Sequence, residues 1–114
     1  MAYFLCRLNA PRPDFVTTMT DDEMALMGEH AGYLGGLADR GDVLLFGPVL
    51  DPDGAWGLAI LESADEASAG ELLAEDPAIR SGRGFSYKIA LMPRTVVGPA
   101  FSARREGAPT EAVT

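Results

Sequence analysis

The single histidine of the chain, His30, is the residue best suited to acid–base chemistry. Imidazole gains and loses a proton near neutral pH, which makes histidine the most frequent general acid or base. His30 follows Met27 by three positions and precedes Leu34 by four, so it lies at the edge of an apolar helical stripe. A buried histidine satisfied by one hydrogen bond would occupy the same place. The spacing therefore leaves a catalytic and a structural interpretation open.

Asp76 is the residue that we expect to pair with His30. It stands at the predicted end of a second helix, and Pro77 disfavours helical geometry in the residue before it. If both helices cover one face of a sheet, the two side chains can meet. A carboxylate on one ring nitrogen would then fix the tautomer and raise the basicity of the imidazole. The alternative is that Asp76 only ends the helix.

Composition and charge argue against several other kinds of site. One cysteine, Cys6, cannot form an internal disulfide, and together with one histidine it rules out cysteine clusters and multi-histidine metal sites. We expect no metal and no cofactor. The formal net charge of −8 would repel phosphate backbones and anionic lipid headgroups, so we expect neither nucleic acid nor membrane as a partner.

Length and hydropathy predict one globular domain. The 114 residues are 47% hydrophobic and 23% charged, as in ordinary globular proteins. No apolar stretch approaches the roughly 20 residues that a membrane-spanning helix needs. The first residues lack a basic segment ahead of an apolar one, so we expect no signal peptide and a cytoplasmic location.

The elements that must position His30 and Asp76 follow from capping boxes, periodicity and turn residues. The two helices are expected to start at capping boxes and to end near a glycine and a proline. Their order with the strands is strand–helix–strand–strand–helix–strand, which predicts a four-stranded antiparallel sheet with both helices on one face. The expected strands are Tyr3–Leu8, Val43–Leu50, Ala55–Leu61 and Phe85–Leu91; the helices begin at Thr20–Glu23 and Ser63–Glu66 and run to about Arg40 and Glu75.

The first helix has an apolar stripe at three- and four-residue spacing, and its several glycines predict close packing against the sheet. The stripe consists of Met24, Met27, Ala31, Leu34 and Ala38, with Leu37 beside it.

Two further segments are candidates for a binding site. The apolar side chains of a loop that contains Phe15 and Met19 are expected to cover another surface of the protein, and a binding site is one candidate for that surface. Gly47-Pro48 interrupts the second strand, where it can mark a bulge, a sheet edge or a close approach of backbone to a ligand.

The third strand predicts a dimer. Its residues Trp56, Leu58 and Ile60 face one way, and Ala59 and Leu61 face the other, so both faces of the sheet are apolar. Two helices cover one face only, and an exposed apolar face of that size is a liability. A second copy packed sheet to sheet would cover it. Alternatively, the loop after the first strand or the C-terminal tail covers this face.

The ordered combination of several short segments resembles the YCII-related family of small bacterial proteins, which have the dimeric α+β barrel, or ferredoxin-like, fold. The resemblance covers about residues 3 to 95, which we expect to form the domain, with a loosely ordered tail over 96–114. The matching segments are Arg12–Phe15, Met19–Glu23, Glu29-His30, Tyr33-Leu34, Leu37, Gly41, Phe46–Val49 and Asp76–Ile79.

The resemblance implies a homodimer with face-to-face sheets and an active site built on a histidine and an aspartate, here His30 and Asp76. Some members of this family and fold are dehydrochlorinases, isomerases or cofactor-free monooxygenases. We therefore predict a cofactor-independent lyase or isomerase for a small polar or aromatic substrate, with Phe15, Phe46 and Gly47-Pro48 lining the pocket. The alternative is a non-catalytic binding or accessory protein, in which the pair has only a structural role.

Overall fold

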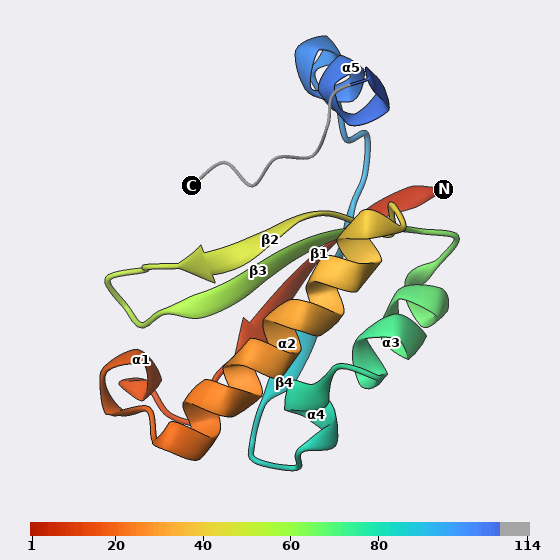
Figure 1. Ribbon diagram of the computed structural model, residues 1–114. Helices are drawn as coiled ribbons and strands as arrows, with labels where there is room; N and C mark the ends of the chain where they lie inside the picture. Colours follow the sequence, from red (N-terminus) through yellow and green to blue (C-terminus); the bar gives the residue numbers. More distant parts are fainter. Residues whose placement is uncertain (108–114) are drawn as a thin grey trace.

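The computed structural model describes residues 1–107, with side chains through residue 103. In this part of the chain, four strands form a single sheet, and five helices of very different length connect or follow them (Figure 1). The elements in chain order are β1 (Ala2–Asn9), α1 (Phe15–Thr18), α2 (Asp21–Asp39), β2 (Val43–Val49), β3 (Trp56–Ser63), α3 (Glu66–Ala74), α4 (Pro77–Arg80), β4 (Ser86–Met92) and α5 (Pro99–Gly107).

The sheet is antiparallel throughout and has the strand order β2-β3-β1-β4. Helices α2 and α3 cover one face of it, and α5 lies away from this helical layer (Figure 1). The predicted order of elements and the α+β, ferredoxin-like fold are thereby confirmed. Among the described residues, no helix has both the length and the apolar character needed to cross a lipid bilayer.

Alternation along the strands divides the sheet into two faces. Phe4, Cys6 and Leu61 point toward the helices and are buried. Leu5 and Ile60, which are paired across β1 and β3, belong to the opposite face and are only partly buried. The face without helices is therefore apolar at its centre, as the sequence predicted.

The start of α2 has the predicted capping box. The Glu23 amide donates to Thr20 Oγ1 at 3.2 Å, and the Thr20 amide donates to Glu23 Oε1 at 2.9 Å. At the other end, Gly41 has a φ of +87°, the left-handed conformation that glycine adopts without strain after a helix. Both ends of the helix that carries His30 are thus set by local sequence.

The predicted core stripe of α2 is partly wrong. Met24 is 59% exposed, whereas Leu26, outside the predicted stripe, is buried together with Leu34 and Leu37. The apolar residues of this helix fit two neighbouring stripes, and packing against the sheet selects the one that includes Leu26. The buried Glu23 lies at the start of that stripe.

The glycines of α2 do not pack closely, contrary to the prediction. A Cβ atom added to any one of them would meet no other atom within 4 Å in the described part of the chain. Most of these glycines lie on the solvent side of the helix, where nothing requires a missing side chain. They are Gly28, Gly32, Gly35 and Gly36.

Two local expectations are also corrected. The second helix is capped by Asp65, which accepts from the Ser68 amide at 2.7 Å, because Ser63 is still paired within β3. The loop after β1 contains the short helix α1. Of the alternatives left open for Gly47-Pro48, the sheet edge fits, because β2 is an edge strand and its irregular pairing lies elsewhere, between Val43 and Leu45.

The segment after residue 95 contains helix α5, where the sequence led us to expect a loose tail. Residues 108–114 of that expected tail lie outside the described residues.

Candidate active site

His30 and Asp76 lie next to each other, although 46 positions separate them in the chain. The distance between His30 Nδ1 and Asp76 Oδ2 is 2.7 Å. His30 comes from the middle of α2, and Asp76 from the junction between α3 and α4, on the same side of the sheet. The Asp76 side chain is fully buried, and that of His30 is 14% exposed.

Asp76 ends α3, as the sequence predicted, and also starts α4. Its Oδ1 atom accepts from the Ala78 amide at 2.9 Å, and Pro77 occupies the first position of α4. This cap fixes the carboxylate, because one oxygen is held by the backbone of α4 and the other is left to face α2. The structural and the chemical interpretation of Asp76 are therefore compatible.

The third member of this group, Tyr87 on β4, is not among the residues predicted from the sequence. Its hydroxyl donates to the same Oδ2 atom of Asp76 at 2.5 Å. A signal was present in the sequence, because the alternation of β4 places Tyr87 on the helix-covered face together with Phe85 and Ile89. A polar-tipped side chain on a core-facing position requires a partner.

The carboxyl group of Asp76 is ionised at neutral pH. Burial acts to raise its pKa, but the hydrogen bonds from His30, Tyr87 and the Ala78 amide outweigh burial and hold the pKa below its ordinary value. Burial, followed by the hydrogen bond to Asp76, raises the pKa of Tyr87, so its hydroxyl keeps its proton and donates it.

An ionised Asp76 determines the tautomer of His30 in this hydrogen-bond network. A carboxylate only accepts hydrogen bonds, so Nδ1 of His30 must carry a proton. In the neutral imidazole, Nε2 is then the atom with a free lone pair, and it can accept a proton from a bound molecule.

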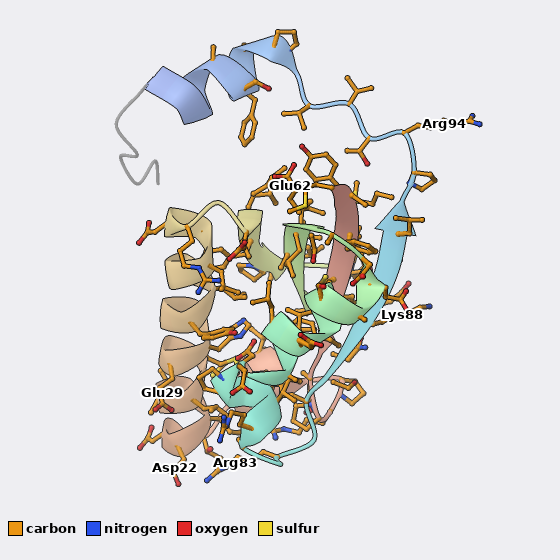
Figure 2. All side chains as sticks on the ribbon, turned by 90° about the vertical axis from the view of Figure 1, so that its right-hand side faces the viewer. Asp22, Glu29, Glu62, Arg83, Lys88 and Arg94 are labelled. Atoms are coloured by element: carbon orange, nitrogen blue, oxygen red, sulfur yellow. The ribbon has the colours of Figure 1, made fainter. Side chains whose placement is uncertain are left out.

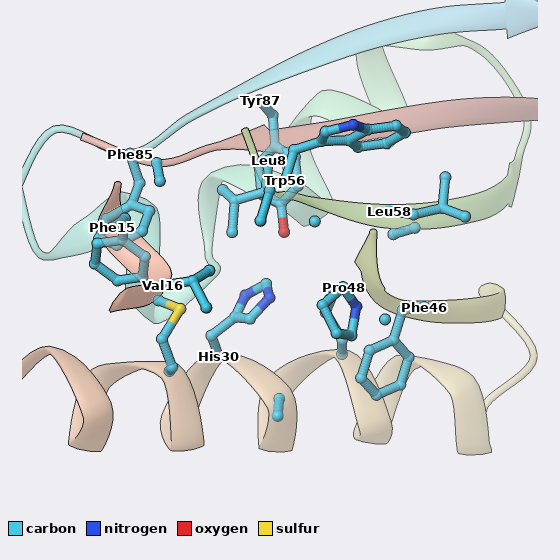
Figure 3. Close-up of a pocket in the computed structure, with 18 of the residues that line it drawn as sticks. Leu8, Phe15, Val16, His30, Phe46, Pro48, Trp56, Leu58, Phe85 and Tyr87 are labelled. Atoms are coloured by element: carbon cyan, nitrogen blue, oxygen red, sulfur yellow. The ribbon is translucent and has the colours of Figure 1, made fainter. Parts of the chain in front are cut away.

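His30 lies in the wall of a cavity of about 340 Å³ between α2 and the sheet. The side chain stands between Val16 on one side and Pro48 on the other, with Leu8 and Tyr87 across from it (Figure 3). His30 and Tyr87 are the only ionisable residues among the described residues that line this cavity. A bound molecule therefore meets an apolar surface with one acid–base group.

All four residues predicted to line a pocket border this cavity. Phe15 contributes from α1, and Phe46, Gly47 and Pro48 contribute from β2. Phe15 is buried, and its ring meets that of Phe85 edge to face with centroids 5.3 Å apart. Among the described residues, no group of three or more histidine, cysteine or acidic side chains could hold a metal ion.

The position of Phe15 is fixed by an ion pair at the start of α2. Arg12 donates to Glu23 Oε1 at 2.7 Å and to Oε2 at 2.9 Å, and also to the Thr18 carbonyl at 2.9 Å. Its guanidinium carbon lies 5.2 Å from the centre of the Phe15 ring. The apolar segment predicted to cover a site is thus attached to the helix that carries His30.

Comparison with known proteins identifies the family. Residues 3–93 match the YCII-related domain. The chain belongs to this family. No curated protein sequence matches this YCII-related chain.

Among solved structures, the YCII-related chain is similar to 5-chloro-2-hydroxyhydroquinone dehydrochlorinase from Burkholderia phenoliruptrix AC1100 in complex with 2,5-dihydroxybenzoquinone. The TM-score is 0.57 and the sequence identity 17%, and the likeness covers 85% of this chain and 97% of the other. At this level of identity, the similarity establishes the shared fold.

Proposed function

We propose that this YCII-related protein is a cofactor-independent enzyme in which His30 is the general acid–base and Asp76 orients it. The observation that carries the proposal is the 2.7 Å hydrogen bond between these residues in the wall of an apolar cavity. The buried carboxylate would stabilise the imidazolium formed when Nε2 takes a proton from the substrate.

The proposed reaction is an elimination or an isomerisation. His30 would remove a proton from a C–H or O–H group, and the electron pair left behind would either expel a leaving group or move a double bond. In an elimination, His30 then gives its proton to the leaving group or to water; in an isomerisation, it returns the proton to another atom of the substrate. The solved structure that resembles this chain is named a dehydrochlorinase, which agrees with the first type.

The substrate we propose is a small aromatic or otherwise apolar molecule without a permanent charge. A cavity of about 340 Å³ suits a small molecule. Since none of the described residues that line it is acidic or is a lysine or arginine, a carboxylate or phosphate group would lose its hydration without gaining a counter-charge.

Replacing His30 by alanine or glutamine tests this proposal against a panel of lactones, enols and halogenated phenols. We expect the turnover rate to fall about 10²- to 10⁴-fold. Binding can be followed separately by the fluorescence of Trp56, the single tryptophan, which borders the cavity. Unchanged turnover in the His30→Ala variant would remove His30 from its proposed role.

A second candidate function is that of a small-molecule-binding protein without catalysis. It is favoured by the cap that Asp76 forms on α4. In this function, the cap and the hydrogen bond to His30 have a purely structural role, which is to join α2 to α4. This function predicts that the fluorescence of Trp56 responds to ligands, that no turnover is found with any of them, and that His30→Ala mainly lowers stability.

We also propose that the protein is a homodimer whose two sheets pack face to face. The sheet face opposite the helices carries Leu5, Leu58 and Ile60 along its middle strands, and a second copy would remove this apolar surface from water. Sedimentation at micromolar concentration is expected to give about twice the 12.1 kDa mass of one chain.

The domain is proposed to end near residue 95. A chain of residues 1–95 is then expected to fold and to have a melting temperature within a few degrees of that of the full chain.

The protein is proposed to work in the bacterial cytoplasm. Fractionation of the source cell would place a cytoplasmic protein with the soluble enzymes, and recovery with membranes would contradict this location.

A further inference from the structure

Tyr87 shares one carboxylate oxygen with His30, and we infer from this geometry that Tyr87 is a positioning residue that keeps His30 a neutral base. The inference rests on the proposed role of His30 in acid–base catalysis and adds a residue that acts on His30 only through Asp76. It makes a prediction about the imidazole itself, which can be measured without any substrate.

Three donors from three elements surround the Asp76 carboxylate. His30 on α2 and Tyr87 on β4 both bond to Oδ2, at 2.7 and 2.5 Å, and the Ala78 amide of α4 bonds to Oδ1 at 2.9 Å. Because Asp76 is fully buried, no hydrogen bond from bulk water replaces one of these donors if it is removed. The negative charge of the carboxylate is therefore stabilised by these three donors and not by bulk water.

The donation from Tyr87 makes Asp76 a weaker partner for a protonated His30. The Tyr87 hydroxyl donates a hydrogen bond to Oδ2 and so stabilises its negative charge. Because of this hydrogen bond, the carboxylate stabilises an imidazolium at His30 less strongly. The hydroxyl also directs the positive end of its dipole at Oδ2, the atom that His30 contacts. Both effects favour the neutral imidazole, which is the form of His30 that can accept a proton.

Other ionisable groups near the pair are engaged elsewhere. Tyr33 donates to the Leu72 carbonyl at 2.5 Å, Cys6 on β1 lies 3.8 Å from the Phe4 carbonyl, and Glu75 pairs with Arg80. β2 has no ionisable side chain. Glu29, the neighbour of His30 on α2, and Asp39 in the last turn of this helix are exposed to solvent, and Arg40 pairs with Asp42 just after it.

Nuclear magnetic resonance can follow the titration of His30 directly, because it is the only histidine in the chain. In the Tyr87→Phe variant, we expect the midpoint of the imidazole titration to move to higher pH by about 0.5 to 1 unit. The matched control is Tyr33→Phe, which also removes a hydroxyl hydrogen-bonded at 2.5 Å, but one bonded to a backbone carbonyl. This control is expected to leave the midpoint in place.

A second variant keeps the test decisive if Tyr87→Phe does not fold. Difluorotyrosine at position 87 keeps the ring and has a more acidic hydroxyl, which is a stronger donor, so it should move the midpoint to lower pH. A midpoint that is unchanged in both variants, or that Tyr33→Phe moves equally, would overturn the inference.

The outcome is independent of whether turnover is found. If an activity is found, the acid limb of its pH–rate profile should move with the imidazole midpoint, while KM stays within about twofold. If no substrate is ever turned over, the titration still decides the role of Tyr87, and only the enzymatic proposal fails.

Discussion

A single buried carboxylate connects the proposed chemistry of this protein to its stability. Asp76 caps α4 and accepts hydrogen bonds from His30 and Tyr87, so it connects α4 to α2 and to β4. Such a group has no alternative partner in water, because it is fully buried. Its replacement is therefore expected to affect folding as well as activity.

The Asp76→Asn variant should lose about 1.5–3 kcal/mol of unfolding free energy at pH 7, the range for hydrogen bonds to charged groups. Because the pKa of Asp76 is lowered by folding, its contribution is complete above its ordinary value of 3.8 and declines as the pH falls below that value. Urea denaturation of the original protein and of the variant between pH 7 and pH 3 measures how the difference in their unfolding free energies depends on pH.

The control for this comparison is Asp53→Asn, which changes an exposed aspartate in the turn between β2 and β3. It should change the unfolding free energy by less than about 0.5 kcal/mol. A similar loss in both variants would mean that the effect is one of net charge and that the hydrogen bonds of Asp76 contribute little.

Among the secondary-structure elements, α2 is the one whose ends and orientation determine the site. Its N-terminus is held twice at Glu23, by the capping box with Thr20 and by the ion pair with Arg12. The hydrogen bonds from Arg12, followed by that from the Thr20 amide, lower the pKa of Glu23 to about 2 from an ordinary value of 4.5. The start of α2 therefore depends on a charged glutamate.

Glu23→Gln is expected to lower the melting temperature at pH 7. Because the pKa of Glu23 is lowered by folding, the stabilisation is complete above pH 4.5 and is lost as the pH falls toward 2, so the difference from the original protein should narrow over that range. Glu29→Gln is the matched control on the same helix; Glu29 points to solvent (Figure 2), and its replacement should have little effect at any pH.

Two glycines should respond to alanine in opposite directions. Gly84, just before β4, has a φ of +95°, and a Cβ there would lie 3.0 Å from Pro11 Cβ, so Gly84→Ala should destabilise the protein by more than about 1 kcal/mol. Gly32 lies on the exposed side of α2 with nothing within 4 Å, so Gly32→Ala should stabilise it by about 0.5–1 kcal/mol. Thermal denaturation measures both; a loss at Gly32 would indicate contacts on that side of α2.

For the molecule as a whole, the proposed dimer explains the apolar face opposite the helices. Ile60 pairs with Leu5 at the centre of that face. A lysine at position 60 would place a charge in the proposed interface, so Ile60→Lys should sediment as a monomer at micromolar concentration. Met24→Lys, which changes an exposed apolar residue of α2, should leave the dimer intact. Monomeric behaviour of the unmodified protein would refute the proposal.

Local features of the sequence predicted the order of elements and the ends of α2, and they limited Pro48 to a bulge, a sheet edge or a close approach to a ligand. Capping, periodicity and proline geometry involve neighbours in the chain, so they can be interpreted without coordinates. His30 and Asp76 could also be nominated, because the chain has one histidine and because Asp-Pro marks the end of a helix. Neither inference depends on their 2.7 Å contact.

Tertiary structure alone decided which stripe of α2 faces the sheet, the volume of the cavity and the bond from Tyr87 to Asp76. The apolar residues of α2 fit two stripes equally well, and only packing buries Leu26 and leaves Met24 exposed. Alternation along β4 indicates that the Tyr87 hydroxyl needs a partner, but that partner lies on a different element, which the pattern of the strand does not identify. Such choices depend on contacts between distant segments, whose energies local patterns do not encode.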